Sequence, residues 1–244
     1  MRYGILGDIH ANLSALEAVL RCFEQEGVDK ILSVGDVVGY GAAPRECIAL
    51  VREVGATVVK GNHDAAAIGE LDTTFFNPHA KAATEWTSGQ LSKQDMAWIE
   101  DLPLIANLSE CSVAHGTFHE PEHYDYIQCT QDADASLDLM DLPVCFVGHT
   151  HVPVVIMRMT DDPTRTAYTI EYEVDLSESA RALVNVGSVG QPRDEDSRAA
   201  YCVYDAEQAT VSIGRAKYDI EREAARIRSA GLPGILADRL FLGV

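Results

Sequence analysis

Short apolar runs alternate with amphipathic segments in the first third of the chain. RYGILGD (residues 2–8) is apolar, and NLSALEAVLRCFEQEG (12–27) places apolar residues on one stripe at helical spacing before Gly27. The pattern recurs in KILSVGD (30–36), in a helical segment from about Pro44 to Val54, and in ATVVKGNHD (56–64). This alternation predicts β and α elements in turn, with parallel strands.

The pattern changes further along the chain. Residues 77–101 predict two helices, the first beginning with an Asn77 cap and Pro78. Strands CSVAHG (111–116) and PVCFVGH (143–149) follow, with a short helix around 131–140 between them. Five strand-like runs then indicate an antiparallel sheet: VPVVIMRM (152–159), AYTIEYEV (167–174), ALVNVGS (182–188), AAYCVYD (199–205) and ATVSIG (209–214). Helical segments broken at Gly231 and Pro233 close the chain, and we expect one sheet to pack on another in a single domain, residues 1–244.

Composition and charge narrow the classes of function. A hydrophobic content of 47% in 244 residues is ample for a packed core. The formal net charge of −19 disfavours extended nucleic-acid binding, because most of the surface repels a polyanion. A small anionic substrate remains compatible with this charge if a bound metal supplies local positive charge.

The chain carries no signal for a membrane or a disulfide framework. No stretch approaches the roughly 20 apolar residues of a membrane span, and no secretory leader is recognisable, so we expect a cytoplasmic protein. The six cysteines lack paired spacing, and several lie in apolar strand-like runs, which predicts buried, reduced thiols.

Polar residues gather where the apolar runs end. Five of the eight histidines lie in five such clusters: GDIH (Asp8, His10), GDVVGYG (Asp36), GNHD (Asn62, His63), AHG (His115) and GHTH (His149, His151). The H-x-H pair alone has an ordinary explanation as a surface strand end. Because loops after parallel strands share one rim of a sheet, we expect the five clusters to converge there.

The chemistry of these side chains indicates metal. Imidazole together with carboxylate suits Mn, Fe, Co, Ni or Zn better than calcium. Eight polar groups exceed the needs of one tetrahedral ion, which suggests two ions roughly 3.5–4 Å apart. Two neighbouring cations need an anionic bridge, which Asp36 can provide, while Asn62 can offer its amide oxygen.

The five clusters, in this order, resemble the calcineurin-like metallophosphoesterase superfamily over roughly residues 3–205. The resemblance implies an α/β (α+β) fold, a two-sheet β-sandwich flanked by helices. It implies two divalent ions, with Mn favoured, and hydrolysis of a phosphodiester or phosphomonoester by metal-activated water. It assigns one metal to Asp8, His10, Asp36 and His151, and the second to Asp36, Asn62, His115 and His149. By the same resemblance His63 is no ligand but lies beside the leaving oxygen, where it can give a proton near neutral pH.

One departure bears on the substrate. The protein phosphatase branch of the superfamily carries GDxVDRG, but Gly39 and Tyr40 stand here where Asp and Arg would be, so the phosphate-binding arginine of that branch is missing. The late segment NVGSVGQPR (185–193) instead resembles small bacterial and archaeal phosphodiesterase-like members. Its Arg193 is a candidate substrate-binding clamp, since a guanidinium matches phosphate oxygens bidentately. The alternative is an exposed arginine paired with the acidic residues at 194–196.

Several alternatives stay open at this point. His119 and His123 are expected in a loop beside the pocket, and His79 is expected to be exposed or capping a helix. A non-catalytic scaffold of the same fold is a rival function, because the superfamily includes a retromer subunit used for protein contacts. A short-substrate nuclease is another, whereas a metallo-β-lactamase lacks its HxHxDH motif here. The sequence leaves the natural substrate, the metal identity and a homo-oligomer undecided.

Overall fold

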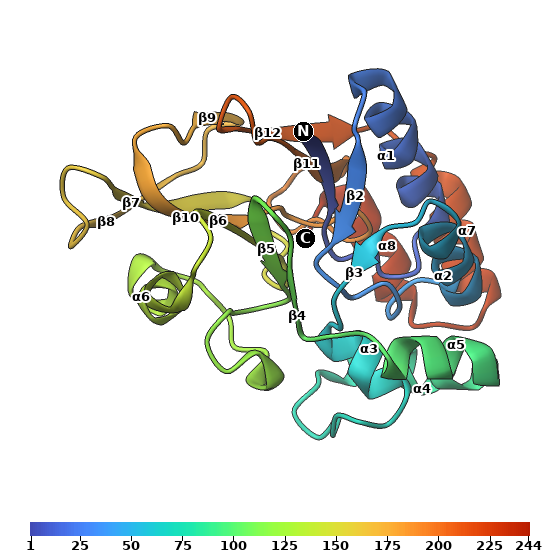
Figure 1. The fold of residues 1–244 in the computed structure, drawn as a ribbon. Coiled ribbons are helices and arrows are strands. Elements are labelled where there is room, and N and C mark those ends of the chain that lie inside the picture. The colour runs from blue at the N-terminus through green and yellow to red at the C-terminus, as the bar shows by residue number, and fades with distance from the viewer.

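Two six-stranded sheets lie face to face with helices on both outer surfaces in the computed structural model, which describes residues 1–244 (Figure 1). The first sheet has the order β3 (Thr57–Val58), β2 (Lys30–Ser33), β1 (Arg2–Leu6), β11 (Ala199–Asp205), β12 (Thr210–Ala216) and β9 (Glu173–Asp175). Its strands β1, β2 and β3 are parallel, as the alternating pattern predicts, and the other pairs are antiparallel.

The second sheet is also mixed. Its order is β4 (Ile105–Asn107), β5 (Cys111–Ala114), β6 (Val144–Val147), β10 (Ser179–Asn185), β7 (Val154–Met159) and β8 (Thr166–Thr169). Strands β5, β6 and β10 run parallel, and the other pairs are antiparallel. The predicted two-sheet sandwich is therefore confirmed, but the strands of the last third are shared between both sheets and do not form one antiparallel sheet.

Most of the helices cover the outer face of the first sheet, and one covers the second (Figure 1). The first group is α1 (Leu13–Glu26), α2 (Pro44–Glu53), α3 (Asn62–Ala67), α4 (Pro78–Gln90), α5 (Lys93–Glu100), α7 (Ile220–Ser229) and α8 (Gly234–Leu242). Helix α6 (Thr130–Leu139) packs on the second sheet, after the short 3-10 helix η1 (Pro121–His123). None of the helices combines the length and the apolar character that a membrane span requires.

Three apolar layers lie against the sheets, and a fourth apolar cluster joins α4, α7 and α8. Tyr3 of β1 and Phe146 of β6 belong to the layer between the sheets. Leu16 and Phe23 of α1 pack with Val203 of β11 in the outer layer of the first sheet. The helix ends as its sequence predicts, because Asn12 accepts a hydrogen bond from the amide of Ala15 and Gly27 adopts a left-handed φ of 65°. The third layer lies between α6 and the second sheet.

The structure differs from the sequence predictions at four points. The single strand expected at 167–174 is two, because β8 pairs with β7 in the second sheet whereas β9 pairs with β12 in the first. Residues 62–67 form helix α3 where a loop was expected. Strand β4 was not anticipated. All six cysteines are free, but Cys129 is exposed and Cys22 is half-buried.

Candidate metal centre

The carboxyl ends of four strands and the start of one helix meet at one rim of the sandwich. Asp8 follows β1, Asp36 follows β2, His115 follows β5 and His149 follows β6, while Asn62 opens helix α3. The structure brings together all seven residues that the family resemblance implies as metal ligands. Each of them is at least nine-tenths buried: Asp8, His10, Asp36, Asn62, His115, His149 and His151.

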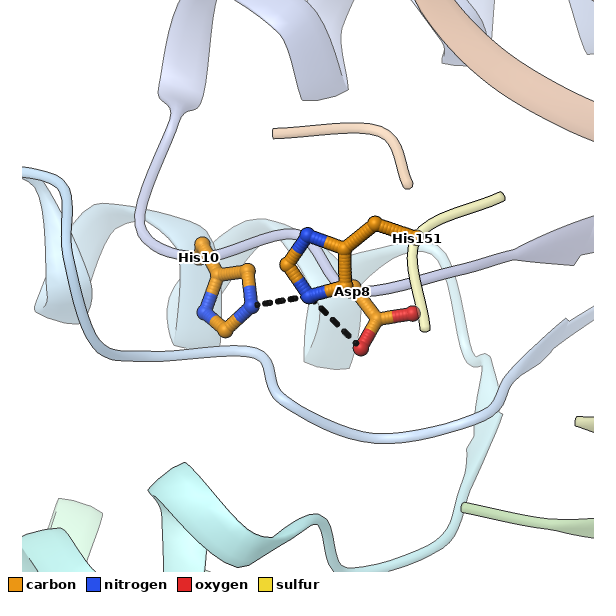
Figure 2. A group of neighbouring side chains, drawn as sticks. All are labelled: Asp8, His10 and His151. Carbon is orange, nitrogen blue, oxygen red and sulfur yellow. Dashed lines mark hydrogen bonds and ion pairs between the residues drawn. The ribbon is translucent and has the colours of Figure 1, made fainter. Parts of the chain in front are cut away.

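The first cluster consists of Asp8, His10 and His151 (Figure 2). The Nε2 atoms of His10 and His151 lie 3.1 Å apart, and Oδ1 of Asp8 lies 3.5 Å from Nε2 of His151. Ligand atoms held at about 2.1 Å from one ion lie about 3.0–3.4 Å apart at angles of about 90–109°. The spacing of the cluster therefore fits a single transition-metal ion.

The second cluster consists of Asp36, His115 and His149, with Asn62 beside them. The Nε2 atom of His115 lies 3.0 Å from Nδ1 of His149 and 3.0 Å from Oδ1 of Asn62. The same atom is 3.5 Å from Oδ2 of Asp36. A carboxylate, an amide oxygen and two imidazoles thus face one point, again at a spacing that suits one ion.

The Asp36 carboxylate of the second cluster also faces the first cluster. Its Oδ2 atom is 3.7 Å from Nε2 of His10 in the first cluster and 3.5 Å from Nε2 of His115 in the second. The backbone amide of His63 donates to Oδ1 at 2.8 Å, while Oδ2 is buried without a hydrogen-bond partner. A buried carboxylate oxygen without a donor is costly, and two cations would satisfy it.

Backbone carbonyls fix the orientation of three of the imidazoles. The Nδ1 atom of His10 lies 3.1 Å from the carbonyl oxygen of Val38, and Nδ1 of His115 lies 2.8 Å from that of Val34. A carbonyl can only accept, so each Nδ1–H donates and each Nε2 keeps its lone pair. His151 does the same toward the carbonyl of Gln191 at 2.6 Å. A hydrogen bond from the ring nitrogen that does not bind metal is characteristic of metal-ligating histidines. Here it leaves the Nε2 lone pairs of His10 and His151 facing each other, an arrangement that a cation between them would stabilise.

Burial shifts the pKa values of the carboxylates upward and those of the imidazoles downward, so both kinds of group are pushed toward their neutral forms. It raises the pKa of Asp8 to about 7 and lifts that of Asp36 well above its usual range, because a buried carboxylate loses its hydration. Burial also lowers the pKa values of His10, His149 and His151 well below the usual range. The imidazoles are therefore neutral at pH 7, the form that binds metal.

The backbone reaches these positions at a cost in strain. Five of the candidate ligands have positive φ, at 39–68°: Asp8, His10, Asp36, His149 and His151. A non-glycine residue in this region costs roughly 1–3 kcal/mol, and such strain is typical of functional sites.

Two motif glycines leave space for the carboxylates. A Cβ atom on Gly61 would lie 2.1 Å from Oδ1 of Asp36, and one on Gly148 would lie 2.2 Å from Oδ2 of Asp8. Both distances are far inside van der Waals contact. The glycines of GNHD and GHTH are therefore required by the close approach of these loops to the aspartates.

His63 lies beside the two clusters but belongs to neither. Its ring packs 4.5 Å from that of Tyr40, and 5.0 Å from both His10 and Phe76, between ring centroids. Nδ1 of His63 is buried without a partner. Burial, with the charge of Arg193 as a smaller cause, lowers the pKa of His63 to about 3, so the ring is neutral at pH 7 in the free chain.

Arg193 reaches toward the same rim. Its Nη2 donates to Oε1 of Gln191 at 3.1 Å and to the hydroxyl of Tyr40 at 3.4 Å, while its Nε is buried without a partner. The acidic neighbours pair elsewhere, since Asp194 contacts Arg215 and Asp196 contacts Arg198. The surface pair that the sequence left open is thus not the arrangement found.

The other three histidines lie apart from the clusters. His79 is an exposed residue in the first turn of α4. The side chains of His119 and His123 are 43% and 57% exposed, and both face the carboxylate of Glu120. His119 lies in a loop, as expected, whereas His123 ends the short helix η1.

Sequence reasoning missed three residues of the site. Tyr40 packs on His10 and His63, and the Tyr126 ring stacks on His149 with centroids 3.8 Å apart. The Asp64 carboxylate accepts hydrogen bonds from the amides of Val38 and Gly61, which ties two metal loops together. Asp64 stands inside the GNHD cluster, so its motif was a usable signal. No sequence motif pointed to Tyr126, which lies in a loop.

The fold and the site define an α/β sandwich with paired carboxylate and histidine clusters fit to hold metal ions. Residues 1–209 match the family model of the calcineurin-like phosphoesterase superfamily domain, and the chain belongs to this family.

Several known proteins are similar to the chain over most of its length. The crystal structure of a metallophosphoesterase from Sphaerobacter thermophilus superposes with a TM-score of 0.88 at 41% identity, covering 100% of this chain and 99% of that one. An uncharacterized protein of Methanocaldococcus jannaschii is 36% identical over 98% of this chain and 97% of its own. Phosphodiesterase YfcE of Escherichia coli is 27% identical over 65% of this chain and 73% of its own.

Proposed function

We propose that the chain is a phosphoesterase that uses two divalent metal ions to hydrolyse a small phosphodiester or phosphomonoester. The observation that carries the proposal is the buried Oδ2 of Asp36, which faces His10 of the first cluster and His115 of the second without a hydrogen-bond donor. Family membership and the similarity to a phosphodiesterase support the class of reaction. Manganese is the ion we favour for the first tests.

The residues divide into two ligand sets that share Asp36. Asp8, His10 and His151 complete the first set, and Asn62, His115 and His149 complete the second. Two bound divalent ions supply Lewis acidity, a water of lowered pKa and compensation for the charge that builds on the phosphoryl group. The carbonyls of Val34, Val38 and Gln191 hold the imidazoles in place, so little reorganisation is needed for binding.

His63 is the proposed proton donor to the leaving oxygen. Because its pKa is about 3 in the free chain, the ring is not charged at neutral pH before substrate binds. A phosphoryl anion beside the ring would raise this pKa, since an opposite charge favours the imidazolium. His63 therefore acts as an acid only with substrate in place. The expectation that His63 gives a proton near neutral pH therefore applies to the substrate-bound state.

Arg193 is the proposed clamp on a phosphoryl oxygen. Tyr40 and Gln191 hold its Nη2, which leaves the buried Nε free to donate. A charge-assisted bond from a pre-positioned guanidinium is among the stronger hydrogen bonds in proteins. Tyr40 occupies the position where the protein phosphatase branch has its arginine. Its hydroxyl accepts a hydrogen bond from Arg193, so Tyr40 positions the proposed clamp and is not itself the clamp.

Hydrolysis of bis(p-nitrophenyl) phosphate by the metal-stripped and Mn-loaded protein tests the proposal. We expect turnover that requires added Mn and disappears with a chelator. Two bound ions without hydrolysis of any phosphomonoester, phosphodiester or dinucleotide would reject catalysis and favour the non-catalytic scaffold.

A further inference from the structure

A largely apolar groove of about 780 Å³ opens beside the metal centre. One wall is the segment 126–130, and the other comes from strands β7 and β8 and the residues that flank them. Four exposed large apolar side chains line it, with exposed fractions of 37–72%: Tyr126, Val152, Tyr168 and Ile170. Exposed apolar groups gathered along one groove mark a binding surface.

The groove and the metal centre share residues. Tyr126 lines the groove, and its ring stacks on the imidazole of His149 at 3.8 Å and 28°. Thr150 lines it from between the two histidines of GHTH, and Arg193 lies at the same boundary. A group attached to a phosphate at the metal centre would therefore enter this groove.

The charge of the lining restricts what fits. The chain has 38 acidic residues, yet none of the 13 lining residues is acidic, and Arg193 is the only charged one. A lining with so little charge disfavours a cationic group or a second phosphate deep in the groove, because neither would find an opposite charge there. The rings of Tyr126 and Tyr168 offer faces for stacking, while Gln128 and Thr130 offer hydrogen-bond donors and acceptors.

We propose that this groove binds the uncharged heteroaromatic ring of a nucleoside phosphoester whose phosphate lies at the metal centre. The inference rests on the proposed function and narrows its substrate class. A ring with polar edges uses both the aromatic faces and the amide and hydroxyl groups, whereas an alkyl chain would leave the polar groups unused. Stacking on tyrosine tolerates any base, so the groove selects nucleosides as a class.

Three diesters with the same leaving group test the assignment: the p-nitrophenyl esters of thymidine monophosphate, methyl phosphate and hexyl phosphate. We expect the thymidine ester to have at least a 10-fold higher kcat/KM than the methyl ester in the Mn-loaded protein. Tyr168→Ala should lower kcat/KM for the thymidine ester by roughly 5- to 150-fold, mainly through KM, and leave the methyl ester unchanged. Tyr172→Ala removes a tyrosine that is 53% exposed and outside the groove, and it should change neither.

Other results would overturn the inference. Equal efficiencies for the thymidine and methyl esters with no effect of Tyr168→Ala reject the subsite, and a preference for the hexyl ester assigns the groove to an aliphatic group. If Tyr168→Ala alters only the mass measured by light scattering, the groove is a contact between copies. If no ester is hydrolysed, the proposed function fails, and calorimetric titration with thymidine monophosphate decides the subsite. Binding that Tyr168→Ala weakens supports it, and no binding rejects it.

Discussion

The backbone amide of His63 donates a 2.8 Å hydrogen bond to Oδ1 of Asp36, so the start of helix α3 orients the carboxylate that faces both clusters. Oδ2 is left buried, 3.7 Å from Nε2 of His10 and 3.5 Å from Nε2 of His115. One hydrogen bond thereby connects the residue proposed as proton donor and the residue proposed as metal bridge. Their roles are still separable, because His63 contacts Asp36 through its main chain and not through its imidazole.

Replacing the bridge should remove metal. In Asp36→Asn the charge between two cations is lost, so both metal content and hydrolysis should fall. The loss of affinity should exceed the roughly 10–100-fold that removal of an outer hydrogen-bond partner produces. Elemental analysis after desalting measures it, with the exposed Asp162→Asn as the matched control. A variant that keeps two ions and normal turnover would show that Asp36 is not the bridge.

His63→Ala should separate catalysis from metal binding. The main-chain contact to Asp36 survives, so metal content should stay normal, while turnover falls by roughly 10²–10⁴-fold for loss of a positioned acid. The effect should be smaller for a p-nitrophenyl ester than for an alkyl ester, whose leaving oxygen needs a proton more. Metal analysis and kinetics on both esters measure this. Loss of an ion in this variant would make His63 a ligand.

Arg193→Ala should weaken substrate binding without disturbing the metals. Loss of a charge-assisted contact costs about 1.5–3 kcal/mol, or roughly 10- to 150-fold in kcat/KM. Arg193→Lys should restore part of this, because an ammonium cannot reproduce the guanidinium fork. Arg198→Ala, which removes an exposed pair with Asp196, is the control. Unchanged steady-state kinetics in Arg193→Ala with both metals bound would reject the clamp.

Adding one methyl group at Gly148 should damage the first cluster. The new Cβ would lie 2.2 Å from Oδ2 of Asp8, so the carboxylate must move and Mn binding should weaken. Gly89→Ala is the control, because the added Cβ would meet no atom within 4 Å beyond its own helix backbone, and alanine favours helix α4 by about 0.5–1 kcal/mol. Mn titration of both variants checks the contrast. Wild-type Mn affinity in Gly148→Ala would contradict the crowding.

The sequence could predict the elements whose signals are local. Asn12 and Gly27 bound helix α1, and the apolar runs before Asp8 and Asp36 end as parallel strands of one sheet. The convergence of the candidate ligands followed from the same rule, because loops after parallel strands share a rim. The order of the five motifs along the chain also indicated the calcineurin-like superfamily, and the match to the family model confirms this. The single-domain organisation, in contrast, stays a prediction.

Features that depend on packing could not be predicted in this way. The alternation at 167–174 indicates which side chains of a strand point inward, but it does not indicate which sheet the strand joins. The change from β8 in the second sheet to β9 in the first could therefore not be predicted. The low pKa of His63 comes from burial against Tyr40 and Phe76, which no motif encodes. The stacking of Tyr126 on His149 depends on the path of a long loop.

The number of metal ions per folded chain tests the central claim most directly. The protein would be stripped with a chelator, saturated with Mn, desalted and measured by elemental analysis, with circular dichroism to confirm folding. We predict two ions per chain, because the two clusters and the shared Asp36 form two ligand sets. One ion or none on a folded, Mn-saturated chain would contradict the dinuclear centre.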